Sequence, residues 1–293
     1  MFSWTGFEPI CQTDVPLRGH TSYRLGGPAR LCFTPRDESD LAALLRRCND
    51  LEVSWRVLGG GSNLLVRDEG VTEAVIKLGG KSFGATDYCD GVLSVGSAVE
   101  MLALVKHAAR MGWCGLERLA GIPGTVGGAV RMNAGGRYGC VAELVRDVTI
   151  VTPAGEIVTR TAGQLDFRYR KTELEGGIVT SVRFNLEPSD PAETHDRYLA
   201  IWNDKYATQP PLRMRSAGCV FKNPSGKSAG ALIQQAGLKG HRLGGAEISE
   251  RHANFIVAGD GASSSDVLGL IELARERVRG EFDVELALEV EIW

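Results

Sequence analysis

The stretch "LAGIPGTVGGAVRMNAGGRYG", residues 119–139, contains seven glycines. Glycine loses more conformational freedom on folding than any other residue, so a stretch this rich in glycine is costly to order. Such a segment is typical of backbone that lies close to something flat or charged, and we expect no regular helix or strand within it. Thr125, Asn133 and the N–H groups of the loop can bond the polar edge of a ring. A tight multi-turn loop without a ligand is the alternative interpretation.

A second glycine-rich segment, "VLGGGSNLLV" at 57–66, follows a predicted strand over 53–58. Three successive glycines let the backbone approach a ligand and turn its N–H groups toward an anion. The segment lacks the G-K-[ST] of a P-loop and the G-x-G-x-x-G spacing of a Rossmann turn. A loop that only connects two strands is the alternative. Together the two segments indicate a ligand-binding surface made of backbone, in a fold that is not a Rossmann fold.

Composition narrows the class of protein. The chain has 293 residues, 43% hydrophobic and 24% charged, with a net charge of -3. This charge disfavours nucleic acid and anionic membranes as partners. No signal peptide and no membrane-spanning apolar run is recognisable. Seven cysteines without a C-x-x-C pair, and histidines without H-x-x-x-H spacing, predict reduced thiols in the cytoplasm and no bound metal.

Hydrophobic periodicity and turn signals predict alternating helices and strands. Helices are expected over 38–48, 98–112, from Pro191 after a cap at Asp190, over 228–236, and over 263–280. Strands are expected over 53–58, 73–78, 91–97, in a hairpin over 146–160, and over 176–186, 253–258 and 282–292. The last strand is expected because apolar residues alternate strictly with acids or Ala.

Four further motifs accompany the glycine-rich segments: "HTSYRLGGPA" (20–29), "YRK" (169–171), "SAGCVFKNP" (216–224) and "LEV" (288–290). They follow one another in order over nearly the whole chain. In this combination the sequence resembles the UDP-N-acetylenolpyruvoylglucosamine reductase family, MurB, of bacterial cell-wall synthesis. The short segment between Tyr198 and Lys227 resembles the family's smaller class, which lacks a substrate-covering tyrosine loop.

The resemblance implies an α+β chain with a vanillyl-alcohol-oxidase-type FAD-binding fold of two subdomains, 1–80 and 81–188. A C-terminal α+β substrate-binding domain, 189–293, follows. It also implies non-covalent FAD, and NADPH that enters the substrate site, so that no second dinucleotide motif is needed. The expected protein is a monomer that acts on a UDP-sugar. The residues expected to hold FAD are Gly59, Gly60, Gly61, Ser62, Asn63, Leu64, Gly121, Thr125, Gly127, Gly128, Asn133 and Gly135.

The family's reaction adds hydride to C3 of an enolpyruvyl ether and a proton to C2, giving a lactyl ether. Negative charge develops at C2, so the site needs a cation near the substrate carboxylate and a proton donor. Motif by motif, the resemblance assigns these catalytic roles to Arg170, Cys219 and Glu289. Each has a plainer interpretation: Arg170 as part of a solvated basic surface, Cys219 as a small buried residue, and Glu289 on the wet face of a strand.

The resemblance also assigns substrate contacts to Tyr169, Lys222, Asn223 and His252. Three positions depart from the family pattern and affect the nucleotide end of the expected site: Arg215, Ala287 and Glu291. We predict that Cys219 donates the proton to C2, because a free thiol, with a pKa of about 8.5, is protonated at neutral pH yet gives its proton readily.

Two other functions stay open from the sequence. The first is an FAD-dependent alcohol or hydroxy-acid oxidase on the same flavin scaffold, with the flavin attached to His20, Cys114 or Cys140. Flavin that stays with the denatured chain would identify it. The second is a non-catalytic flavin or UDP-sugar sensor. A sensor needs no proton donor, so the presence of Arg170, Cys219 and Glu289 together argues against it.

Overall fold

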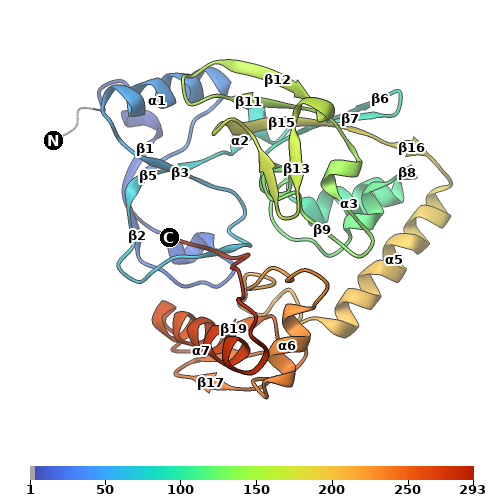
Figure 1. Ribbon diagram of the computed structural model, residues 1–293. Helices are drawn as coiled ribbons and strands as arrows, with labels where there is room; N and C mark the ends of the chain where they lie inside the picture. The colour runs from blue at the N-terminus through green and yellow to red at the C-terminus, as the bar shows by residue number, and fades with distance from the viewer. Residues whose placement is uncertain (1–3) are drawn as a thin grey trace. The chain divides into compact units, whose positions relative to one another are not determined.

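The computed structural model describes residues 4–293, and its contacts divide the chain into two compact units (Figure 1). The first unit holds the described residues up to Thr13, Leu31–Gly60 and Glu73–Lys205. The second unit holds Asp14–Arg30, Gly61–Thr72 and Tyr206–Trp293. The chain therefore passes between the units several times. The three consecutive domains expected from the sequence, 1–80, 81–188 and 189–293, stay a prediction.

A five-stranded antiparallel sheet is the largest sheet of the first unit. Its strand order is β12 (Ile157–Thr161), β11 (Val145–Val151), β15 (Ile178–Asn185), β7 (Val92–Gly96) and β6 (Thr86–Cys89). The hairpin predicted over 146–160 is confirmed, with pairs running from Asp147↔Thr161 to Val151↔Ile157. The predicted strands over 91–97 and 176–186 are confirmed as β7 and β15.

A four-stranded sheet has the order β1 (Cys11–Pro16), β2 (Pro28–Phe33), β5 (Val71–Lys77) and β3 (Trp55–Leu58), with β3 parallel to β5. Helix α1 (Glu38–Asp50) connects β2 to β3, and the Asp37 side chain caps it by accepting the Asp40 N–H at 2.9 Å. Leu41, Leu44, Leu45 and Cys48 are buried on one face of α1, as their helical spacing predicts.

The glycine-rich stretch does contain regular structure, which corrects our expectation. Helix α4 (Val126–Arg131) forms within it, capped by Thr125 Oγ1, which accepts the Gly128 N–H at 3.4 Å. Val126, Ala129 and Val130 are buried on one face of α4. Most of the stability of a short helix comes from tertiary packing of such a face, and here it outweighs the poor helix propensity of glycine.

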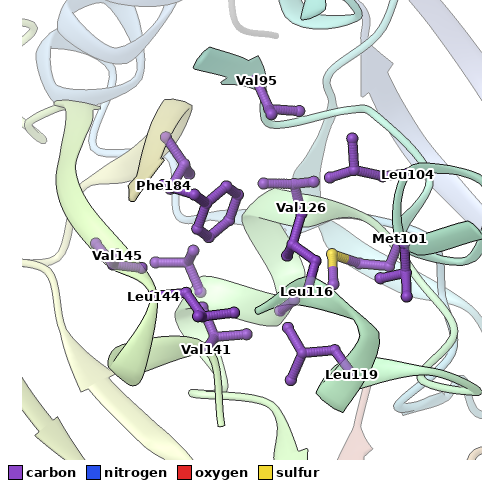
Figure 2. Close-up of a cluster of buried hydrophobic side chains, with 14 of the residues drawn as sticks. Val95, Met101, Leu104, Leu116, Leu119, Val126, Val141, Leu144, Val145 and Phe184 are labelled. Atoms are coloured by element: carbon purple, nitrogen blue, oxygen red, sulfur yellow. The ribbon is translucent and has the colours of Figure 1, made fainter. Parts of the chain in front are cut away.

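The buried cluster in Figure 2 is the larger of two hydrophobic clusters described in the first unit, the other of which includes the buried face of α1. Side chains from β7, α3 (Met101–Arg110), α4 and β15 converge there. The labelled members are Val95, Met101, Leu104, Leu116, Leu119, Val126, Val141, Leu144, Val145 and Phe184. Both ends of the glycine-rich stretch are thus anchored in one core.

Helix α5 (Pro191–Thr208) begins as predicted, because Asp190 Oδ1 accepts the N–H groups of Ala192 (2.8 Å) and Glu193 (3.0 Å). The smaller elements of the first unit are α2 (Gly80–Phe83), β8 (Trp113–Cys114), β9 (Gly135–Gly136), β10 (Gly139–Cys140), β13 (Asp166–Arg168), β14 (Lys171–Glu173) and β16 (Glu187–Pro188). Over the described residues, no helix combines the length and apolar character needed to cross a membrane.

In the second unit, helix α7 (Ser264–Phe282) packs on the antiparallel sheet of β17 (Arg242–Leu243), β18 (Ala246–Ile248) and β19 (Ile256–Ala258). A capping box forms at the start of α7: Ser263 Oγ accepts the Asp266 N–H at 3.1 Å, and Asp266 Oδ2 accepts the Ser263 N–H at 3.0 Å. Helix α6 (Ala229–Gln235) contacts α7, and Ser228 caps it.

The strand predicted over 282–292 is largely wrong. Helix α7 continues to Phe282, and only β20 (Glu291–Ile292) is a strand, parallel to β4 (Leu64–Leu65). Between them the chain is extended and meets Phe221 through a single bridge at Leu288. The alternating pattern correctly marks the buried side chains of Leu286 and Val290. It does not predict a continuous ladder, because the backbone neighbour changes along the segment.

Candidate functional site

The two glycine-rich segments meet in the first unit, backbone against backbone. A Cβ atom on Gly60 would lie 2.7 Å from Gly124 Cα, and one on Gly59 would lie 3.0 Å from Thr125 Oγ1. Real Cβ atoms do not approach backbone this closely, so glycine is needed at Gly60 for the loops to pack. The glycines therefore allow the loops at 59–60 and 124–125 to lie side by side, as expected of two segments that bind the same ligand.

Two neighbouring glycines of α4 differ in what lies beside them. A Cβ atom on Gly127 would lie 2.8 Å from Ser97 Cβ, whereas one on Gly128 would meet only Thr125 Oγ1, at 3.5 Å. Gly127 is therefore explained by protein packing, and Gly128 leaves ordinary space beside it. The buried Ser97 hydroxyl has no hydrogen-bond partner among the described residues. A polar ligand beside this loop would suit both features.

The rest of "GGGSNL" belongs to the second unit. Gly61 has a φ of 62°, and a Cβ atom there would overlap the His20 carbonyl oxygen. Asn63 Nδ2 donates to the Glu289 carbonyl oxygen at 2.9 Å, and the Asn63 carbonyl accepts the Glu291 N–H at 3.0 Å. The predicted cofactor segment thus also holds the chain that carries Glu289, which sequence analysis did not foresee.

Arg170 lies in a two-residue turn between β13 and β14, where Arg168 pairs with Lys171. Its φ is 58°, in the left-handed region, and its guanidinium lies 5.0 Å from the centre of the exposed Tyr169 ring. Asn133 Nδ2 donates to the Arg168 carbonyl oxygen at 3.1 Å and so supports the hairpin. The role of Asn133 as a cofactor contact stays a prediction.

The chain segments that carry Cys219 and Glu289 are joined in the second unit by backbone hydrogen bonds, one of them at Val220, the residue after Cys219. The Glu289 N–H donates to the Val220 carbonyl oxygen at 2.8 Å. Two residues after Val220, the Lys222 N–H donates to the Ala287 carbonyl oxygen at 2.8 Å. Cys219 and Glu289 are both half-buried, which is the exposure expected of groups that meet a ligand rather than of core residues.

Asn254 is a residue of this site that sequence analysis missed. It is only 3% exposed, and both polar atoms of its side chain bond Phe221: Oδ1 accepts the N–H at 2.9 Å, and Nδ2 donates to the carbonyl at 2.7 Å. Its own carbonyl oxygen accepts the Val220 N–H at 2.8 Å. The signal in the sequence was an asparagine inside the apolar run "ANFIVA", where a buried amide needs specific partners.

Two of the expected substrate contacts, His252 and Asn223, form hydrogen bonds within the second unit. His252 Nδ1 accepts the Asn254 N–H at 3.2 Å, and burial, reinforced by Lys239, lowers the pKa of His252. Asn223 Oδ1 accepts the Ala229 N–H at 3.0 Å at the start of α6. Their roles as substrate contacts, and those of Tyr169 and Lys222, stay predictions.

The three departures from the family pattern lie at the surface or on the C-terminal segment. Arg215 pairs with the exposed Asp260 at 3.2 Å, and its backbone meets Ala258 at the edge of β19. Ala287 and Glu291 are exposed residues of the C-terminal segment. The hydrogen bonds that join Val220 to Glu289 and Lys222 to Ala287 use only backbone atoms, so substitution of the side chain at 287 does not remove them.

The chain is similar to known proteins over nearly its whole length. Residues 209–293 match the family described as UDP-N-acetylenolpyruvoylglucosamine reductase, C-terminal domain, and residues 29–161 match the FAD binding domain family. A relative from Heliobacterium modesticaldum, named UDP-N-acetylenolpyruvoylglucosamine reductase, is 42% identical over 280 residues, which cover 94% of this chain and 88% of the relative. One of the same name from Anaeromyxobacter sp. is 43% identical over 282 residues, which cover 95% and 87%. The crystal structure of UDP-N-acetylenolpyruvylglucosamine reductase (MurB) from Thermus caldophilus matches with a TM-score of 0.83 and 42% identity, over 97% of this chain and 98% of that one.

Proposed function

Because the chain belongs to the UDP-N-acetylenolpyruvoylglucosamine reductase family, we propose that it reduces UDP-N-acetylenolpyruvoylglucosamine to UDP-N-acetylmuramate for peptidoglycan synthesis, with NADPH as reductant. Its fold is α+β: an FAD-binding fold of the vanillyl-alcohol-oxidase type followed by the family's C-terminal domain. The observation that supports the catalytic part of the proposal is the backbone hydrogen bond from the Glu289 N–H to the carbonyl oxygen of Val220, the residue after Cys219.

FAD fits the residues of the glycine-rich segments. In the first unit, Gly59, Gly60, Thr125 and Gly128 would hold it through backbone and hydroxyl groups, with ordinary space left beside Gly128. Gly127 fits a different role, because Ser97 occupies the place of its side chain. When bound, FAD supplies the hydride for C3 of the substrate. The chain itself must then supply the positive charge and the proton that the reaction needs.

Arg170 supplies the positive charge in this proposal. A guanidinium is always charged and can bond both oxygens of a carboxylate at once. The turn between β13 and β14, supported by Asn133, gives it a defined position. The negative charge that develops at C2 lies next to the substrate carboxylate, so Arg170 stabilises the transition state more than the ground state.

Cys219 supplies the proton. Its S–H bond breaks as the C–H bond at C2 forms, and the thiolate left behind takes a proton from solvent. In this proposal Glu289, whose N–H bonds the Val220 carbonyl oxygen, orients Cys219 or a water molecule beside it. A thiol suits this step because it is protonated at neutral pH yet more acidic than a hydroxyl.

Anaerobic half-reactions test the proposal. NADPH should bleach the flavin absorbance, and the enol ether should restore it, with one deuterium from heavy water at C2 of the product. Cys219→Ala should bleach normally but recover slowly, whereas Cys219→Ser should recover substantially. Flavin that no enol ether reoxidises would refute the function, and normal recovery in Cys219→Ala would move the proton donor elsewhere.

The competing oxidase is checked in the same preparation. Non-covalent FAD should leave the chain when the protein is denatured, whereas flavin attached at His20, Cys114 or Cys140 would stay with it. We also propose that the enzyme works as a monomer in the cytoplasm, where NADPH and UDP-sugars are made. Light scattering after size-exclusion chromatography measures the first of these, and a dimer mass would refute it.

A further inference from the structure

Lys205, on helix α5 of the first unit, extends over the start of the glycine-rich stretch. Its side chain is half-buried, and Nζ donates to the Ala120 carbonyl oxygen at 2.6 Å. The next residue, Gly121, has a φ of 76°, and a Cβ atom there would lie 3.0 Å from Lys205 Cδ. Gly121 was predicted to hold the cofactor. In the structure it leaves room for the stem of this lysine.

The charges around Lys205 are mostly of its own sign. Arg170 and Arg137 both lower its pKa, and Asp204 raises it, after the larger lowering effect of burial. Arg137 forms an ion pair with Asp204 and donates to the Tyr138 hydroxyl at 2.5 Å. Two of the three charged groups that act on Lys205, Arg170 and Arg137, are therefore cations like Lys205 itself. Like charges that act on one another repel, and a bound anion would offset that repulsion.

We propose that Lys205 is a second cation of the anion site at Arg170, and that the two together hold the carboxylate of the enolpyruvyl group. The inference rests on the proposed function and extends it. Lys205 bonds the glycine-rich stretch at Ala120, Asn133 of the same stretch bonds the hairpin that carries Arg170, and all of these residues belong to the first unit. A carboxylate has two oxygens, so it can accept from an ammonium and a guanidinium at the same time.

Ligand affinity at this site should depend on pH, because the two cations differ in pKa. The pKa of Lys205 is lowered to about 8, whereas a guanidinium stays charged throughout. Below pH 8 Lys205 carries its charge and attracts the carboxylate. As pH rises through this value the free enzyme loses the charge, so affinity for the substrate falls. Substitution by Arg should retain affinity and remove this fall.

The experiment compares two ligands on oxidised enzyme without NADPH, by flavin difference spectra or calorimetry from pH 6.5 to 9.5. One ligand is the enol ether, and the other is UDP-N-acetylglucosamine, which has the same pyrophosphate but no carboxylate. Lys205→Met should weaken the enol ether by about tenfold to a hundredfold, the range for one lost charge-assisted hydrogen bond. Binding of UDP-N-acetylglucosamine should stay unchanged. Lys205→Arg should bind the enol ether like the wild type and with a flat pH profile.

Lys106→Met is the matched control, because Lys106 is an exposed lysine on α3 of the same unit. Flavin content and the thermal midpoint establish that each variant is folded. Binding by Lys205→Met within twofold of the control would overturn the inference. An equal loss of both ligands would also overturn it, since it would place Lys205 at the pyrophosphate. Failure of the proposed function gives a different result: wild-type enzyme that binds the enol ether but is never reoxidised by it.

Discussion

The hydrogen bonds of Asn254 allow the effect of its removal to be estimated. In Asn254→Ala, the N–H and carbonyl of Phe221 both lose their side-chain partner, while the backbone bond from Val220 to residue 254 stays. Phe221 is 1% exposed, so water cannot replace the lost partner without local opening. Each unsatisfied buried group costs about 1–3 kcal/mol, which gives about 2–6 kcal/mol for the pair. That is a large part of the roughly 5–15 kcal/mol that stabilises a typical domain.

Hydrogen exchange followed by mass spectrometry measures this effect locally. Peptides that cover 216–224 and 286–293 should exchange much faster in Asn254→Ala than in wild type, because the segment opens more often. Asn49→Ala is the matched control: Asn49 donates a single exposed bond to the Pro153 carbonyl, at 2.6 Å. Its loss should change the free energy of unfolding by less than about 1 kcal/mol.

The activity of the same variants separates positioning from general destabilisation. If Asn254 holds the segment that carries Cys219, reoxidation of the flavin by the enol ether should slow while its reduction by NADPH is retained. Exchange in 216–224 no faster than in Asn49→Ala would refute the structural reasoning. Equal losses in both half-reactions would refute the positioning role.

Three further predictions concern other parts of the molecule. Gly127→Ala should lower the free energy of unfolding by about 1–3 kcal/mol, because the new Cβ atom contacts Ser97. Gly128→Ala should leave the free energy of unfolding of the apoprotein unchanged or higher, but it should weaken FAD binding. Normal flavin affinity in Gly128→Ala would contradict this. Arg170→Ala should slow flavin reoxidation by about a hundredfold and flavin reduction far less. Arg168→Ala, which removes an exposed ion pair with Asp166, should change neither rate. Equal effects of the two variants would contradict the proposal. The pKa of His252 is lowered in the folded state, so the unfolded chain binds more protons below about pH 6.5. The free energy of unfolding should therefore decrease as pH falls through that region, and it should decrease less steeply in His252→Gln. Identical slopes of the two proteins in urea titrations would exclude His252 as the cause.

Local structure was largely predictable, because its causes lie within a few residues. The cap at Asp190 forms as expected, and the cap at Asp37 and the capping box from Ser263 to Asp266 are of the same local kind. Each depends on one side chain that reaches an N–H group two or three residues ahead. The hairpin over 146–160 follows from alternation around a turn, which is also local.

The two clear errors share a cause. In the glycine-rich stretch, α4 forms because Val126, Ala129 and Val130 find a core to enter. In the C-terminal segment, the alternation is real, but its backbone partners change from Phe221 to Leu64–Leu65. Both outcomes depend on which other part of the chain packs against the segment. Helix and strand propensities, and the spacing of apolar residues, do not contain that information.

The motifs of the sequence identified the family and the three expected catalytic residues, but not how the chain supports them. Glu289 reaches the Cys219 segment through Val220, and Asn254 bonds Phe221 in that same segment. Lys205 bonds the carbonyl oxygen of Ala120, which is far away in the sequence. Side-chain chemistry is a property of each residue and can be read from the sequence. Which distant groups share a buried hydrogen bond, and how their charges act on one another, is decided only when folding brings them together and removes the water between them.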